Sequence, residues 1–198
     1  MRLYNSLTKE VEDFVPQTPG LVRMYNCGPT VYKRQHIGNF RAFVMADLLR
    51  RSLEFMGFDV TQVMNITDVG HLTEDDLVDA TGDCKLQKEA LRRKMDPWEI
   101  ARVEEQHFKD DLALMEIPPA HHYPRATDHI PQMIEMIEVL LEKKLAYEVD
   151  GNVYFDITQW PKYGALSGNR LDELEAGASG RVDERSDKRH PLDFSLWK

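Results

Sequence analysis

The stretch from Met24 to Asn39 most constrains what this chain can fold into, because it joins a short apolar run, a turn and a helix start. Residues 21–27 alternate between apolar and polar and stop at Gly28-Pro29, a dipeptide typical of turns. Residues 40–56 contain no glycine or proline, and their apolar side chains recur at helical spacing. The sequence therefore predicts a strand, a turn and a helix in direct succession.

The flanks of this helix point to a βαβ unit. Asn39 is a good N-cap before the helix, and Gly57 is a good residue to end it. Residues 58–67 then predict a second strand. Two strands joined through a helix imply a parallel sheet, in which ligands bind beyond the carboxyl ends of the strands. We therefore expect Cys27-Gly28, Thr67-Asp68 and the helix start to meet at one rim.

The rest of the chain alternates helical and extended segments, and Asp150-Gly151 is a strong hairpin signal. Before the central unit we expect a strand over 2–7. After it we expect a loop over 70–83, helices over 85–94, 96–115 and from about 127, the hairpin over 146–156, a short helix over 171–176, a surface linker over 181–190 and a strand over 191–197.

Composition excludes some classes of protein. Apolar residues make up 42% and charged residues 30%, as in soluble globular proteins. No run of about 18 apolar residues could cross a membrane. The formal net charge of −9 gives no overall footprint for nucleic acid, and we interpret the local basic clusters as solvated helix ends. Two distant cysteines fit a reducing cytoplasm, where we expect the protein to act as a monomer.

The helix start could hold an anion. Backbone N–H groups lack partners at helix starts and the helix dipole favours negative charge, so a phosphate fits such a place. Gly38 would let a base or ribose approach the backbone, and His36 could donate to a phosphate. An ordinary capped helix with a surface histidine explains the same residues. Cys27 has two interpretations as well: a small buried apolar residue, or a zinc ligand or nucleophile.

Taken together, several motifs resemble those of bacterial cysteinyl-tRNA synthetases, a family of class I synthetases. The similarity extends over nearly the whole chain. The motifs are Tyr25-Asn26-Cys27-Gly28-Pro29-Thr30-Val31-Tyr32, His36-Ile37-Gly38-Asn39, Asn65-Ile66-Thr67-Asp68-Val69, Tyr123-Pro124-Arg125-Ala126-Thr127, the hairpin over 150–156, Tyr163-Gly164-Ala165-Leu166-Ser167-Gly168 and Asp193-Phe194-Ser195-Leu196-Trp197-Lys198.

The resemblance implies an α/β fold: the first half of a Rossmann-like catalytic domain over 1–117, an inserted α+β connective segment over 118–190, and the start of the return strand over 191–198. It also implies a ligase that forms cysteinyl-adenylate from L-cysteine and ATP with Mg²⁺, then transfers the cysteinyl group to tRNA(Cys). Zinc would be the resident metal.

The resemblance also implies roles for individual residues. Cys27 would be one of four ligands of a zinc ion that binds the substrate thiolate. Cys27, Gly28 and Thr67 would bind the substrate amino acid. Pro29, Thr30, His36, Gly38 and Asn39 would bind ATP, with His36 and Asn39 as catalytic residues. Zinc prefers sulfur, so it would separate cysteine from serine.

Two departures from the family pattern matter. Asn39 stands where the family most often has histidine; asparagine keeps a hydrogen-bond donor but cannot carry charge. The other three zinc ligands, the lysine-rich loop and the anticodon-binding helices would lie beyond Lys198. We therefore expect this chain to be a fragment that is inactive alone. Two alternatives stay open: the related cysteine ligase of mycothiol synthesis, and a truncated paralogue that serves as a non-catalytic binding module.

Overall fold

The computed structural model describes residues 1–69, 85–168, 188–190 and 192–198. These residues form two compact units. One unit comprises residues 16–130, and the other comprises residues 1–15 together with 131–198. The expected loop over 70–83 and the short helix over 171–176 lie outside the described residues, as does most of the expected linker over 181–190.

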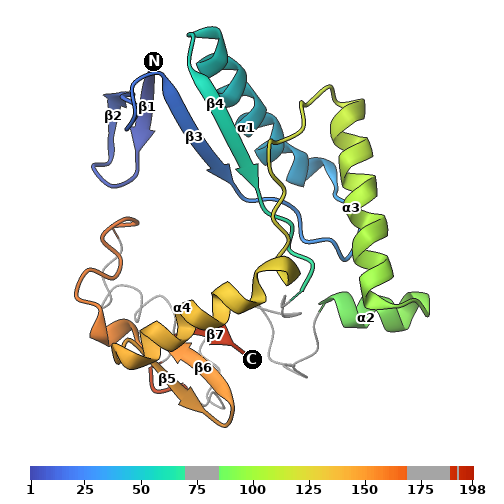
Figure 1. Cartoon of the computed structure of the whole chain (residues 1–198), viewed down its shortest axis with the longest axis vertical. Helices are drawn as coiled ribbons and strands as arrows, with labels where there is room; N and C mark the ends of the chain where they lie inside the picture. The colour runs from blue at the N-terminus through green and yellow to red at the C-terminus, as the bar shows by residue number, and fades with distance from the viewer. Residues whose placement is uncertain (70–84, 169–187, 191) are drawn as a thin grey trace. The chain divides into compact units, whose positions relative to one another are not determined.

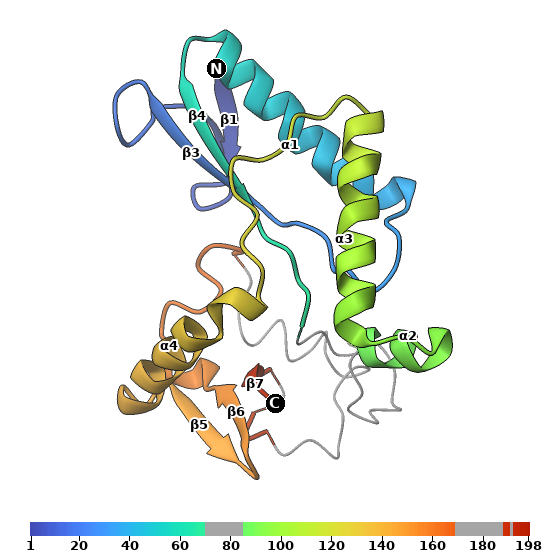
Figure 2. The ribbon, with the colours of Figure 1, turned by 45° about the vertical axis from the view of Figure 1, so that its right-hand side comes forward.

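The first unit is built on a parallel pair of strands, β3 (Leu21–Asn26) and β4 (Asp59–Met64), joined through α1 (Ile37–Phe55). A third segment, residues 121–126, runs parallel along the other side of β4. Its backbone is hydrogen-bonded to Met64 at the end of β4 and to Ile66 just beyond it. Figure 1 and Figure 2 both show this segment descending beside β4 after α3 (Pro97–Leu114). The arrangement confirms the predicted α/β fold with a parallel sheet.

The core lies on the face of the sheet that α1 and α3 cover. Alternation along β4 turns Val60 and Met64 inward, where Ile66 is fully buried. Phe43 of α1 packs edge-on against Phe108 of α3, with ring centroids 5.0 Å apart. α3 begins where expected, because the Asp96 side chain accepts hydrogen bonds from the N–H groups of Trp98 and Glu99. α2 (Lys85–Arg93) precedes it.

The second unit holds two antiparallel sheets. β1 (Arg2–Asn5) pairs with β2 (Glu10–Asp13), a strand that the sequence analysis missed because Pro16 and its polar neighbours favoured a connection. α4 (Ile130–Glu142) precedes the hairpin of β5 (Ala146–Val149) and β6 (Asn152–Phe155) around Asp150-Gly151, as predicted. Short 3₁₀ turns occur at Thr127–His129 in the first unit and at Ile157–Gln159 in the second.

The strand expected near the end of the described chain forms, but with an unexpected partner. β7 (Phe194–Trp197) pairs antiparallel with β6, so within the described residues it adds a third strand to the sheet of the β5–β6 hairpin. The sequence analysis did not predict this pairing, and the return of the chain to the catalytic domain stays a prediction. Phe194 stacks on Phe155 at 5.0 Å, a side-chain contact across strands that residue patterns along one strand do not reveal.

Asp193, directly before β7, is 1% exposed and fastens this sheet from within. Its carboxylate accepts hydrogen bonds from the Tyr147 hydroxyl (2.6 Å), the Ile157 N–H (3.1 Å) and the His190 N–H (3.0 Å). Burial, and then this hydrogen bond, raise the pKa of Tyr147 to about 12. The buried Asp193 carboxylate therefore has its hydrogen-bond partners within the fold.

Candidate functional site

The carboxyl ends of β3 and β4 meet again beyond the strands. After the turn at Cys27-Gly28, the Val31 N–H donates to the Thr67 carbonyl (3.1 Å) and the Thr67 N–H donates to the Pro29 carbonyl (3.0 Å). This exchange brings Thr30 opposite Thr67. Residues that lie far apart in the sequence are therefore joined at one rim, as expected for a parallel sheet.

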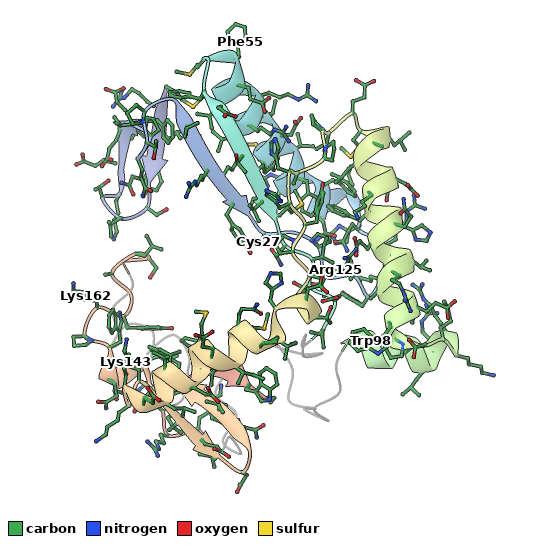
Figure 3. The ribbon with its side chains drawn as sticks, in the orientation of Figure 1. Cys27, Phe55, Trp98, Arg125, Lys143 and Lys162 are labelled. Carbon is green, nitrogen blue, oxygen red and sulfur yellow. The ribbon has the colours of Figure 1, made fainter. Side chains whose placement is uncertain are left out.

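A pocket of about 400 Å³ opens at this rim. Of the predicted site residues, Thr67 alone is not in its lining, although its backbone is bonded to Pro29 and Val31. Cys27 is exposed, so its interpretation as a buried apolar residue is wrong; it lies at the end of β3 (Figure 3). The pocket is lined by Cys27, Gly28, Pro29, Thr30, Tyr32, Lys33, Gln35, His36, Gly38, Asn39, Ala42 and Phe43.

His36 and Asn39 close the start of α1 together. His36, not Asn39, is the N-cap: its Nδ1 accepts from the Gly38 N–H (3.1 Å). Asn39 is the third helical residue, and its Oδ1 accepts from the His36 N–H (3.1 Å). The prediction of Asn39 as N-cap rested on residue preference, which cannot distinguish the cap from the partner that completes a capping box.

This capping box changes how the helix start could bind an anion. The Asn39 and Phe40 N–H groups donate to the His36 carbonyl at 2.9 and 3.3 Å, and the Gly38 N–H is bound to the His36 ring. The expectation that free backbone N–H groups hold a phosphate is therefore wrong for these three groups. The side chains of His36 and Asn39 offer further donors.

Both capping side chains keep donors for a ligand. Because His36 Nδ1 accepts a hydrogen bond, the neutral imidazole carries its hydrogen on Nε2. Because Asn39 Oδ1 accepts, the Asn39 amide nitrogen and its two hydrogens remain on the other side of the group. Both residues line the pocket, and such donors suit phosphate oxygens.

Asn65, which the sequence analysis assigned no role, hydrogen-bonds at the same rim. Its side chain accepts from the Gly28 N–H (2.9 Å) and the Tyr25 hydroxyl (3.0 Å), and donates to Thr67 Oγ1 (3.1 Å). Gly28 also packs closely on Asn65: a Cβ at Gly28 would lie 1.7 Å from the Asn65 carbonyl oxygen. The signal that could have found Asn65 is alternation, since residues 65 and 67 face the same side of a strand.

Ion pairs hold the elements around the rim. Arg125, labelled in Figure 3, forms a bidentate pair with Glu105 of α3 at 2.7 and 2.8 Å. Lys109 adds a contact to Glu105 at 2.6 Å. Burial opposes the ionisation of Glu105, but these hydrogen bonds outweigh it and hold the pKa of Glu105 below its usual value. Asp68, next to Thr67, accepts from the Thr127 hydroxyl at 2.6 Å. Segment 121–127 is thus fastened on both sides.

The loop between the turn and α1 is held in the same way. Arg34 pairs with Asp111 of α3, and this hydrogen bond lowers the pKa of the Asp111 carboxyl below its usual range. Gln35 donates to the Thr30 carbonyl at 3.1 Å. These contacts shape the pocket lining between Thr30 and His36.

A complete metal centre is not present in the described part of the chain. Those residues contain no group of three or more His, Cys, Asp or Glu side chains that could hold a metal ion. Cys27 supplies one thiol at the pocket. Among the described residues, none of the helices is long and apolar enough to span a membrane.

The chain is similar in sequence to known proteins over its whole length. Cysteine–tRNA ligases from Chlorobaculum tepidum and Symbiobacterium thermophilum are 44% and 46% identical to the chain over its whole length. The enzyme from Thermus thermophilus is 43% identical over 99% of it. The chain spans only 40–41% of the length of these curated relatives.

A solved structure shows the fold independently. The LeuRS of Agrobacterium radiobacter K84, in a ternary complex with tRNA and LeuAMS, matches 74% of this chain and 18% of its own, with a TM-score of 0.51 at 19% identity. The chain therefore shares its Rossmann-like fold with this structure. A family model described as "tRNA synthetases class I (C) catalytic domain" matches residues 13–198. The chain belongs to this family of class I tRNA synthetase catalytic domains.

Proposed function

We propose that the protein containing this chain is a cysteine–tRNA ligase, and that the chain supplies one wall of its active site. The observation that carries the proposal is the pocket that joins an exposed cysteine, Cys27, to the capped helix start of His36 and Asn39. Relatives named cysteine–tRNA ligase match the chain over its full length, which supports the assignment. A cytoplasmic location and a monomeric state stay predictions.

The pocket residues divide into two groups by chemistry. His36 Nε2 and the Asn39 amide would donate to phosphate oxygens of ATP. Mg²⁺ would partly neutralise the negative charge of these phosphates. Gly38 leaves room for the nucleoside, and Pro29 and Thr30 line the same side. The cysteine carboxylate would attack the α-phosphorus and pyrophosphate would leave, so donors aimed at the α-phosphate stabilise the charge that develops. The adenylate would then acylate tRNA(Cys).

Cys27, Gly28 and Thr67 form the amino-acid side. The thiol of Cys27 fits the role of one zinc ligand, but the described residues do not complete a site, and we assign no step to the metal. When bound, zinc would favour a sulfur over an oxygen in the substrate side chain. Because the chain spans two fifths of its relatives, the whole activity is proposed for the full-length protein.

The test is cysteine-dependent ATP–pyrophosphate exchange by the full-length protein, followed by acylation of tRNA(Cys). We expect His36→Ala to lower the exchange rate by about 100- to 1000-fold, as loss of a transition-state donor does. His122→Ala is the matched control, because His122 is an exposed histidine outside the pocket lining. Exchange that does not depend on cysteine would contradict the proposal, and transfer to an amino-sugar inositol in place of tRNA would assign the mycothiol ligase.

A further inference from the structure

Asn65 connects three groups of the rim through one amide. It lies one residue beyond β4 and is half-buried, and it contacts the Gly28 backbone, the Tyr25 hydroxyl and the Thr67 hydroxyl. Gly28 follows Cys27 directly. The two residues on the amino-acid side that come from different strands, Cys27 and Thr67, are therefore linked through Asn65.

The orientation of the amide follows from its partners. A backbone N–H can only donate, so the atom 2.9 Å from the Gly28 nitrogen must be the amide oxygen. The Tyr25 hydroxyl then donates to the same oxygen. The amide nitrogen faces Thr67 and must donate to Thr67 Oγ1.

This orientation sets the polarity of Thr67. Its oxygen accepts from Asn65, so the hydroxyl hydrogen stays available to donate to another acceptor. The position of Gly28 is set as well, because its N–H is bound and its α-carbon packs against the Asn65 carbonyl. One residue therefore fixes both the place of the turn after Cys27 and the direction of the Thr67 hydroxyl.

We propose that Asn65 is a positioning residue for the amino-acid side of the pocket, which holds the Cys27-Gly28 turn and the Thr67 hydroxyl in register for substrate cysteine. The inference rests on the proposed function. Asn65 has no described contact with His36 or Asn39, so its effect concerns cysteine and not ATP.

Steady-state kinetics of the full-length protein test the proposal. We expect Asn65→Ala to raise KM for cysteine about tenfold or more, while KM for ATP stays within about twofold. Asn5→Ala is the matched control: Asn5 also accepts from a backbone N–H and donates to a side chain, but it lies in β1. Equal changes in both KM values, as from general loosening of the fold, would overturn the proposal.

Asn65→Asp separates the two contacts. A carboxylate still accepts from the Gly28 N–H but cannot donate to Thr67, so the turn stays anchored while the Thr67 hydroxyl must reverse. We expect a raised KM for cysteine with a Gly28 amide that exchanges as slowly with deuterium as in the wild type. An unchanged KM for cysteine in this variant would show that the Thr67 contact does not position substrate.

Hydrogen exchange also distinguishes failure of the proposed function from failure of the Asn65 inference. ATP–pyrophosphate exchange that does not depend on cysteine in the wild type would contradict the proposed function, whatever the effect of Asn65. The Gly28 amide still decides the anchoring: we expect it to exchange about tenfold faster in Asn65→Ala than in the wild type or in Asn5→Ala. An unchanged exchange rate overturns the inference even if the ligase activity is present.

Discussion

The hydrogen-bond networks around Asn65 and Asp193 contain the same kinds of donor but differ in their exposure to water. Each central side chain accepts from a backbone N–H and from a tyrosine hydroxyl. Tyr147 is 5% exposed beside Asp193, whereas Tyr25 is 64% exposed beside Asn65. A buried network contributes to the stability of its unit, because its donors find no water when it breaks. The Tyr25 contact of Asn65 is open to water and costs little to break, so the value of the half-buried Asn65 network lies in where it holds Gly28 and Thr67.

Asp193→Ala should give the largest effect. It removes the acceptor of two buried donors and of one half-buried donor, and we expect the sheet of β5, β6 and β7 to lose about 4 kcal/mol of unfolding free energy. Hydrogen exchange of β5 and β6 peptides in urea measures this unit separately. Glu148→Ala, an exposed position on β5, is the control and should change stability by less than about 0.5 kcal/mol. A loss of unfolding free energy below about 1 kcal/mol in Asp193→Ala would contradict the expected difference in stability between the two networks.

High pH should weaken the same unit. The pKa of Tyr147 lies near 12 in the folded protein and near 10 unfolded, so its stabilisation is complete below pH 10. It is lost as pH rises from about 10 to 12, by about 2 to 3 kcal/mol. Tyr147→Phe should abolish this decline in unfolding free energy. A decline of equal size in the phenylalanine variant would assign it to other groups.

Gly28→Ala should disturb the hydrogen bonds of Asn65 through a steric clash. The new Cβ would overlap the Asn65 carbonyl oxygen and Met64 Cγ, so the turn must move, at about 2 kcal/mol. We expect the rate of cysteine-dependent ATP–pyrophosphate exchange in Gly28→Ala to fall well below the rate in a control glycine variant. That control is Gly57→Ala, where φ is +89° and no atom lies within 4 Å; it should lose about 1 kcal/mol but keep its activity.

Tyr25→Phe should have the smallest effect on stability. The substitution removes an exposed hydroxyl whose place at the Asn65 oxygen water can take, so we expect a loss of less than about 0.5 kcal/mol. Tyr147→Phe, the same substitution in the buried network, should cost about 1 to 1.5 kcal/mol at neutral pH. Urea unfolding of both variants provides the comparison, and equal losses would argue that exposure does not separate the networks.

Local patterns in the sequence predicted the elements better than their partners. Helical spacing located α1, and Asp150-Gly151 located the hairpin of β5 and β6. The sequence did not predict the pairing of β7 with β6, because strand pairing depends on contacts between distant residues.

Within the candidate site, residue types predicted which residues gather at the pocket but not the bonds among them. Seven of the eight predicted residues line it. Asn65 escaped because an asparagine after a strand is also common turn chemistry. Only the positions of Gly28, Tyr25 and Thr67 distinguish the two roles.

The pairing of residues 121–126 with β4 has a consequence for synthesis of the chain. Until residue 126 has left the ribosome, one edge of β4 lacks the partner that it bonds in the folded unit. At about 5 to 20 residues per second, the delay after β4 lasts about 3 to 12 seconds. During that interval the nascent β3–α1–β4 segment presents an open strand edge to chaperones and to neighbouring chains.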